Sequence, residues 1–136
     1  FTVTPGFQLV ALDAATGRPI DTFGQNGIVD LKRQLGVELD VRTAAIGNSS
    51  PPLVFEDLVI IGPALEVGTR PPSYRNVPGR ILAMDARTGA LRWRFNTIPA
   101  RGEPGHDTWE GGSAEYTGNA GAWAPLSLDE SRGLLY

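Results

Sequence analysis

The sequence predicts an all-β fold, namely a segment of a β-propeller built from four-stranded antiparallel blades. The first observation is a repeated phrase: residues 8–23 read QLVALDAATGRPIDTF, and residues 80–95 read RILAMDARTGALRWRF. The second is the stretch 50–62 between the copies, which is rich in Val, Ile and Phe and is typical of a half-buried hairpin. The third is the content of 17 Gly and 11 Pro in 136 residues, which favours a turn-rich β protein.

Each copy of the phrase predicts a strand, a turn and a returning strand. An apolar run ends in Asp-x-x-Thr-Gly, at residues 13–17 in the first copy and 85–89 in the second. The Asp and Thr side chains can bond turn amides, and Gly adopts positive φ without steric cost. A hairpin that recurs as a unit is the signature of a repeat architecture.

The elements follow in order along the chain. With the four strands of a blade named A to D in chain order, we expect the C–D half of one blade at 1–23 and a connecting loop at 24–49 with a short helix within 29–39. A complete blade follows at 50–97, then a long functional loop at 98–122 and the A–B half of the next blade at 123–136. The complete blade has predicted strands at 51–55, 58–62, 80–86 and 90–97, and an insertion at 66–78 separates the second strand from the third. We therefore expect an internal segment that cannot close a ring alone.

Composition excludes several classes of function. The net charge is −3 and no basic cluster is present, so nothing indicates a nucleic-acid partner. No apolar run approaches the roughly 18–20 residues of a membrane-spanning helix. The absence of Cys excludes disulfides and thiolate metal sites in this stretch. By contrast, the 25-residue loop at 98–122 has little aliphatic periodicity, and such long loops are usually functional.

The chain resembles the pyrroloquinoline-quinone (PQQ) dependent dehydrogenases nearly from end to end. The matching motifs are Ala-x-Asp-Ala-x-Thr-Gly followed by Trp93, DTFGQNG at 21–27, NVPG at 76–79, NTIP at 96–99, GEPGHDTWE at 102–110 and YTGNAGAWAP at 116–125. The branch most similar to it is the membrane-type glucose, quinate or polyol dehydrogenases. The resemblance implies an eight-bladed propeller with PQQ and a divalent cation, usually Ca²⁺, near its axis.

The resemblance also implies an activity. A sugar, polyol or cyclic alcohol is oxidised to the carbonyl or lactone, and the electrons pass to a quinone or cytochrome. It further implies a periplasmic parent protein and is compatible with an inner-membrane anchor. The catalytic aspartate of the family lies outside this segment, so we assign no catalytic residue here and expect the segment alone to be inactive.

Three residues are candidates for the site that the resemblance implies. Trp123 stands six residues before Asp129, as in the family, where a Trp forms the flat floor under PQQ; the alternative is packing between blades. Ser50 stands where the family uses hydroxyls to bond a PQQ carboxylate; the alternative is a turn cap. Glu66 resembles the carboxylate that binds the cation; the alternative is a solvated loop residue. Gly121 replaces a Thr that contacts the cofactor in the alcohol-oxidising branch.

Other aromatic and polar residues favour structural roles. We expect Trp93 to pack between blades and Trp109 to pack within the loop. His106 and Asp107 are adjacent, and neighbouring residues in a β-rich loop point apart, so a substrate-entrance or packing role is favoured over catalysis.

Two other functions remain open for a chain with these repeats. One is a non-catalytic propeller with PQQ-like repeats that acts as a binding or assembly scaffold. Such scaffolds have short loops between blades, so the long loop 98–122 argues against this alternative. The other is a pseudoenzyme or truncated product that has kept the repeat and lost the site.

Overall fold

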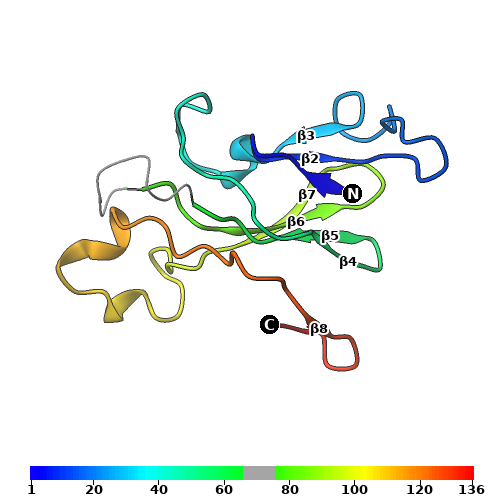
Figure 1. Ribbon diagram of the computed structural model, residues 1–136. Coiled ribbons are helices and arrows are strands. Elements are labelled where there is room, and N and C mark those ends of the chain that lie inside the picture. The colour runs from blue at the N-terminus through cyan, green and yellow to red at the C-terminus, as the bar shows by residue number, and fades with distance from the viewer. Residues whose placement is uncertain (66–75) are drawn as a thin grey trace.

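The computed structural model describes residues 1–65 and 76–136, and its strands form three antiparallel sheets (Figure 1). The first sheet holds β1 (Thr2–Val3), β2 (Gln8–Val10) and β3 (Ile28–Asp30); the central sheet holds β4 (Leu53–Phe55), β5 (Leu58–Ile61), β6 (Ile81–Asp85) and β7 (Leu91–Phe95); the last holds β8 (Leu128–Asp129) and β9 (Leu134–Leu135). The helices are the 3₁₀ segments η1 (Lys32–Leu35), η2 (His106–Thr108) and η3 (Glu110–Glu115). The all-β prediction is therefore confirmed. In the part of the chain that the structure describes, no helix is long and apolar enough to span a membrane.

The central sheet is a meander whose strands pair in chain order, β4-β5-β6-β7. Its four strands fall within residues 50–97, where the sequence predicts a complete blade. Val59 of β5 pairs with Val54 of β4 on one side and with Met84 of β6 on the other. Between β6 and β7 the register shifts at Ala83 and Met84, which is a β-bulge that increases the local twist.

The first sheet differs from the expected hairpin over residues 8–23. The returning stretch forms no strand: it pairs with residues 11–13 through the bridge between Leu12 and Pro19 and through two backbone hydrogen bonds, Ile20 N to Ala11 O and Asp13 N to Arg18 O. The strand β2 itself pairs with β3, from the region expected to be a connecting loop. Pro19 has no N–H to donate to a ladder. The turn before Ile28 reverses the chain and brings β3 alongside β2, where Val29 is 7% exposed, whereas Ile20 is 39% exposed. Burial of Val29 therefore favours the pairing of β3 along β2, while the hairpin is confined to the residues next to its turn.

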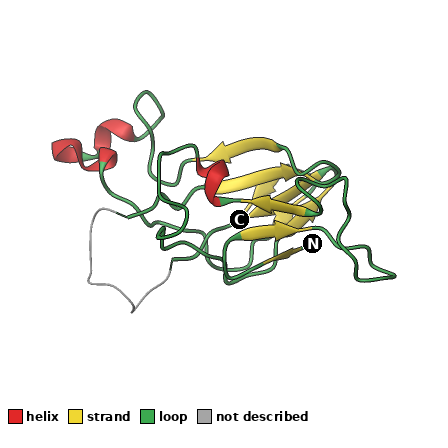
Figure 2. Cartoon of the chain, turned by 90° about the horizontal axis from the view of Figure 1, so that it is seen from above, coloured by secondary structure: helices red, strands yellow, loops and turns green. Residues whose placement is uncertain are grey.

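The first and central sheets lie one above the other and share one hydrophobic core (Figures 1 and 2). The first sheet and the segments around it contribute Phe7, Leu9, Ala11, Phe23, Val29, Leu31, Leu35 and Ile46, and the central sheet contributes Val59, Ile61, Leu82 and Met84. Burying one such side chain fully stabilises the fold by about 1.5–3 kcal/mol. The core therefore fixes one blade against the next, and η2 and η3 lie to one side of the strands (Figure 2).

The repeated Asp-x-x-Thr-Gly turns have the predicted hydrogen bonds. Asp85 Oδ1 accepts hydrogen bonds from Thr88 N at 2.9 Å and from Thr88 Oγ1 at 3.0 Å, and Asp13 Oδ1 accepts the equivalent bonds from Thr16 at 2.8 and 2.7 Å. Gly17 and Gly89 have φ of 71° and 74°, as expected. The Asp side chain therefore replaces the backbone partners that the turn lacks.

Two arginines, one just before β6 and one in β7, bind the end of η1. Arg80 Nη1 donates to the carbonyl of Leu35, and Arg94 Nε donates to the carbonyl of Gln34. The last carbonyls of a helix have no partner within it and favour a cation nearby. Arg80 and Arg94 therefore tie the first part of the chain to the complete blade.

Candidate functional site

Three stretches of chain meet at the end of the central sheet where β4 begins and β5 ends. They are residues 47–50, 62–64 and 121–123, which we call the Trp123 platform. Gly47 and Ala64 exchange two backbone hydrogen bonds, of 2.8 and 2.9 Å. Asn48 Nδ2 donates to the carbonyl of Gly62 at 2.9 Å. The segment before β4 is therefore fixed to the segment after β5.

The third stretch lies directly on the second because both positions of contact are glycine. A Cβ added at Gly62 would overlap the carbonyl oxygen of Ala122, and one added at Gly121 would overlap the carbonyl oxygen of Pro63. Backbone approaches this close exclude any side chain. The absence of a Thr at position 121, noted from the family pattern, therefore has a steric cause in this chain.

The loop 98–122 reaches the platform by crossing the segment before β6. Asn119 N donates to the carbonyl of Val77 at 3.0 Å, and Pro78 and Asn119 form a parallel bridge. Gly79 and Gly118 permit this crossing, because a Cβ on either would overlap a backbone carbonyl of the other segment. Asn119 and Ala120 then have φ of 68° and 51°, and this left-handed pair turns the chain toward Trp123.

Trp123 and Ser50, the two predicted cofactor residues that the structure describes, lie together in the platform. Ser50 Oγ donates to the carbonyl of Trp123 at 2.6 Å, and Ser49 Oγ donates to the same oxygen at 2.8 Å. Trp123 itself is 67% exposed. The hydroxyl of Ser50 thus contacts the backbone of the other candidate, and its predicted bond to a cofactor stays a prediction. Sequence reasoning did not identify Ser49.

The predicted metal ligand, Glu66, lies outside the described residues. Within 1–65 and 76–136, no group of three or more His, Cys, Asp or Glu side chains is arranged to hold a metal ion. The prediction that Glu66 binds a cation is therefore not tested.

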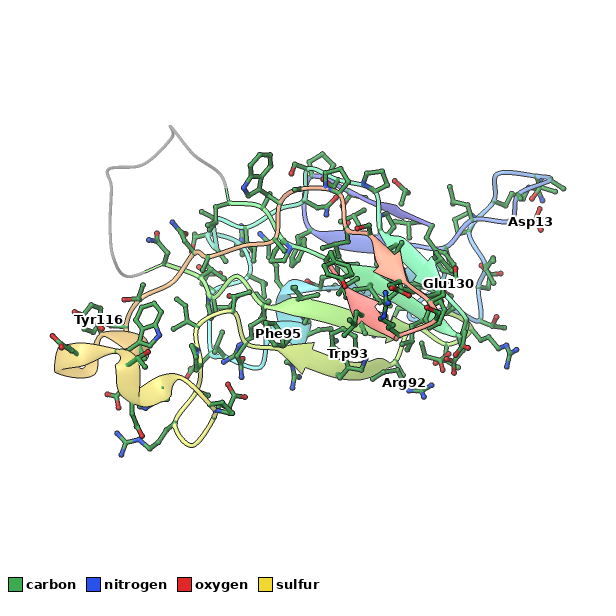
Figure 3. The ribbon with its side chains drawn as sticks, turned by 90° about the horizontal axis from the view of Figure 1, so that it is seen from below. Asp13, Arg92, Trp93, Phe95, Tyr116 and Glu130 are labelled. Atoms are coloured by element: carbon green, nitrogen blue, oxygen red, sulfur yellow. The ribbon has the colours of Figure 1, made fainter. Side chains whose placement is uncertain are left out.

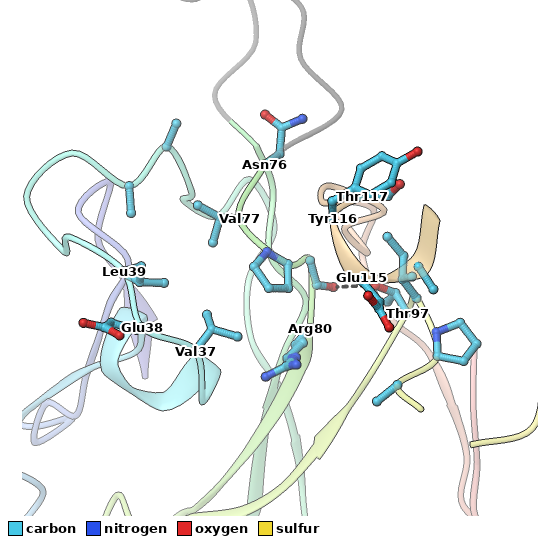
Figure 4. A pocket seen from close by; sticks show the side chains of 18 of the residues that line it. Val37, Glu38, Leu39, Asn76, Val77, Arg80, Thr97, Glu115, Tyr116 and Thr117 are labelled. Atoms are coloured by element: carbon cyan, nitrogen blue, oxygen red, sulfur yellow. Dashed lines mark hydrogen bonds between the residues drawn. The ribbon is translucent and has the colours of Figure 1, made fainter. Parts of the chain in front are cut away.

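A cavity of about 1030 Å³ lies next to the place where the loop 98–122 pairs with the segment before β6 (Figure 4). Its walls come from within residues 37–45, 76–80, 97–101 and 114–117, and from His106. Burial lowers the pKa of Arg80, which lines the cavity; the charge of Arg94 lowers it further, and that of Glu103 opposes this. The walls include neither Trp123 nor Ser50, so the cavity and the platform are separate features.

The other residues singled out in the sequence, Trp93, His106 and Asp107, lie outside the Trp123 platform. Trp93 and Phe95 lie on β7, the edge strand of the central sheet, and are 38% and 59% exposed (Figure 3). Within the described residues Trp93 is therefore not enclosed between two blades, and its predicted packing there stays a prediction. His106 Nδ1 lies 3.5 Å from Asp107 Oδ1, whose side chain is fully exposed. The two side chains therefore do not point apart as expected, because they lie in the 3₁₀ segment η2 and not in extended chain. His106 lines the cavity, and its entrance or packing role stays a prediction.

Comparison with known proteins assigns the family. The model of the PQQ glucose/ethanol/alcohol dehydrogenase β-propeller domain matches residues 1–136. The fold and the repeats define a quinoprotein-type propeller, and the chain belongs to this PQQ dehydrogenase family.

Individual relatives agree with this assignment. The chain is 29% identical to the glycerol dehydrogenase large subunit of Gluconobacter oxydans over 98% of its length, and 31% identical to quinoprotein glucose dehydrogenase A of Acinetobacter calcoaceticus over 95%. A solved structure of a quinohemoprotein alcohol dehydrogenase from Pseudomonas putida superposes with a TM-score of 0.66 at 26% identity, covering 94% of the chain and 17% of that protein. The chain covers 17% and 15% of the two enzymes named first.

Proposed function

We propose that this chain is a cofactor-facing segment of a PQQ-dependent dehydrogenase that oxidises a sugar, polyol or cyclic alcohol to the carbonyl or lactone. The observation that carries the proposal is the exposure of Trp123. The residue is 67% exposed, although two serine hydroxyls donate hydrogen bonds to its carbonyl. The family match and the glycerol and glucose dehydrogenases among its relatives support the class of reaction and of substrate.

The residues of the platform fit a planar cofactor. An indole offers the largest flat apolar face of any side chain, and two hydrogen bonds to its carbonyl hold the backbone of Trp123 in the platform. When bound there, PQQ would accept two electrons from the substrate. Trp123 would supply the stacking surface, and the segment that crosses at Asn119 would hold Trp123 against the blade.

Three finer proposals accompany this one. Glu66 would be one carboxylate ligand of Ca²⁺, a cation that prefers oxygen ligands. Electrons would leave the reduced cofactor for a quinone or a cytochrome, and the parent protein would work in the periplasm. These proposals rest on the family resemblance.

The test uses the full-length protein that contains this segment, purified without cofactor and reconstituted with PQQ and Ca²⁺. Reduction of an artificial electron-accepting dye is measured with glucose, glycerol, quinate and ethanol in turn. We expect dye reduction with at least one polyol or sugar, and loss of that activity when a chelator removes the cation. If the protein neither reduces the dye nor binds PQQ at micromolar concentration, the proposal is contradicted and a non-catalytic scaffold is favoured.

A further inference from the structure

We propose that the cavity beside the loop 98–122 is a second ligand site, which takes a small organic carboxylate on the guanidinium of Arg80. The proposal goes beyond the oxidation of an alcohol, because neither Trp123 nor Ser50 lines this cavity. It does not depend on the proposed function, although its test uses PQQ to keep the two sites apart.

The positive charge at the base of the cavity comes from two neighbouring arginines. Arg80 lines the cavity between the wall that carries Val37 and the wall that carries Thr97 (Figure 4). Arg80 and Arg94 each donate a hydrogen bond to a carbonyl at the end of η1, and a carbonyl is a neutral acceptor. Within residues 1–65 and 76–136, neither arginine takes part in a salt bridge. Their charges therefore lack a direct partner among the described residues.

The carboxylates around the cavity are engaged elsewhere. Glu115 forms a salt bridge of 2.6 Å with Arg101, and Asp40 accepts hydrogen bonds within its own turn. Glu103 attracts the charge at the base of the cavity, but both of its oxygens already accept hydrogen bonds from residues 96 and 100. Glu38, the remaining acidic residue of the walls, is exposed to solvent, which screens its charge. An anion that enters the cavity would thus meet an unpaired guanidinium.

The burial of Arg80 also favours an anion. Burial lowers the pKa of Arg80, the charge of Arg94 lowers it further, and the charge of Glu103 opposes this. A guanidinium that is partly withdrawn from water is stabilised when a group of opposite charge binds to it. The guanidinium has five N–H donors, and the bond to the carbonyl of Leu35 is made by Nη1. Donors therefore remain for a planar carboxylate, which arginine binds through two parallel hydrogen bonds.

The walls favour a carbon skeleton over an inorganic anion. Apolar side chains from three segments line the same cavity, namely Val37, Leu39, Val77, Ile98 and Pro99. Ligand sites typically combine apolar walls with a few polar groups that fix the orientation of the ligand. The cavity, at about 1030 Å³, has room for a small ring or chain next to the carboxylate. We therefore infer an organic acid and not phosphate or sulfate.

Isothermal titration calorimetry on the full-length protein tests the site. The probe is cyclohexanecarboxylate, and cyclohexanecarboxamide is its uncharged counterpart of similar shape. PQQ and Ca²⁺ are present in one series, to occupy the cofactor site, and absent in the other. We expect the acid to bind equally well in both series, and at least about tenfold more tightly than the amide.

Variants locate the binding. Arg80→Met should weaken binding of the acid at least about tenfold and leave the amide unaffected. Arg87→Met is the matched control, because Arg87 is exposed in a turn and does not line the cavity. If thermal unfolding shows that Arg80→Met does not fold, Val37→Glu replaces it, because a carboxylate added to the wall repels the acid. Its control is Val54→Glu, at an exposed position of β4 outside the cavity.

Several results would overturn the inference. They are no binding of the acid at millimolar concentration, equal affinity for the acid and the amide, and an affinity that Arg80→Met leaves unchanged. Loss of binding when PQQ is present would place the acid in the cofactor site and also overturn it. Inorganic phosphate that binds as tightly as the acid would contradict the assignment to an organic carboxylate. A wild-type protein that binds the acid but not PQQ would overturn the proposed function alone.

Discussion

The hydroxyl of Ser50 lies 2.6 Å from the carbonyl oxygen of Trp123 and donates a hydrogen bond to it. This bond joins the approach to β4 with the approach to β8, which belong to two successive sheets of the chain. It brings together two residues that the family resemblance names as candidates for one cofactor site.

Gly62→Ala should destabilise the Trp123 platform. The added Cβ would overlap the carbonyl oxygen of Ala122, so the segment carrying Trp123 must move away. Overpacking of this kind costs about 1–3 kcal/mol, and we expect that loss in the free energy of unfolding measured with urea. Gly6→Ala is the control, because its Cβ would lie an ordinary 3.7 Å from Thr4 Oγ1. Equal stabilities of the two variants would show that the platform is not tightly packed.

Gly89→Ala should be more destabilising than Gly17→Ala, although both occupy the same place in the repeated turn. Their φ angles are nearly equal, at 74° and 71°, so the backbone strain of the substitution is the same. At Gly89 the new Cβ would also lie 2.6 Å from Val29 Cγ2, whereas at Gly17 it would meet nothing within 4 Å. The difference in unfolding free energy should be about 1–3 kcal/mol. A difference near zero would mean that the second turn does not pack on the first sheet.

Asp85 should make the stability of the protein depend on pH in acid. Hydrogen bonds from Thr88 N–H, from the Thr88 hydroxyl and from Arg87 N–H lower the pKa of Asp85 to about 2 from an ordinary 3.8. Because the folded-state pKa is the lower one, the ionised carboxylate stabilises the fold above pH 3.8, and this contribution is lost as pH falls toward 2.

Comparison with Asp85→Asn measures this contribution, because the amide keeps the size of the side chain without the charge. The difference between the urea midpoints of the wild type and the variant should be largest above pH 4 and should shrink toward pH 2. A difference that stays constant across this range would assign the stabilisation to side-chain shape and not to the ionised carboxylate.

Arg80→Met should loosen the contact between the complete blade and η1. The change removes the hydrogen bond to the carbonyl of Leu35 while an unbranched apolar chain still fills the space. Losing a hydrogen bond from a charged donor costs about 1.5–3 kcal/mol. Arg87→Met is the control, because Arg87 is exposed in a turn. Faster amide exchange of residues 34–36 in Arg80→Met alone would support the contact, and equal exchange in both variants would contradict it.

Local patterns predicted the repeated turns and the central meander well. Asp85, Thr88 and Gly89 lie within five residues of one another, so their hydrogen bonds and the positive φ follow from the sequence alone. The strand β3 was missed because its partner is chosen by tertiary packing. Val29 gains burial in the core between two sheets, and nothing in the pattern around it distinguishes this from a loop.

The candidate site was predicted only in part. Trp123 and Ser50 were named from the family resemblance, but the bond between them spans 73 residues and no local pattern indicates it. Ser49 was missed for the same reason. The glycines gave a usable signal, since Gly62 and Gly121 lie in stretches where a glycine without a turn suggests close backbone approach.

The most direct test of the central claim is the affinity of the full-length apo-protein for PQQ with and without the indole of Trp123. Equilibrium dialysis in the presence of Ca²⁺ gives the dissociation constant for the wild type, for Trp123→Ala and for Trp109→Ala, which removes an indole from the long loop. We predict micromolar or tighter binding by the wild type, at least about tenfold weaker binding by Trp123→Ala, and little change in Trp109→Ala. Binding by Trp123→Ala as tight as that of the wild type would contradict the account.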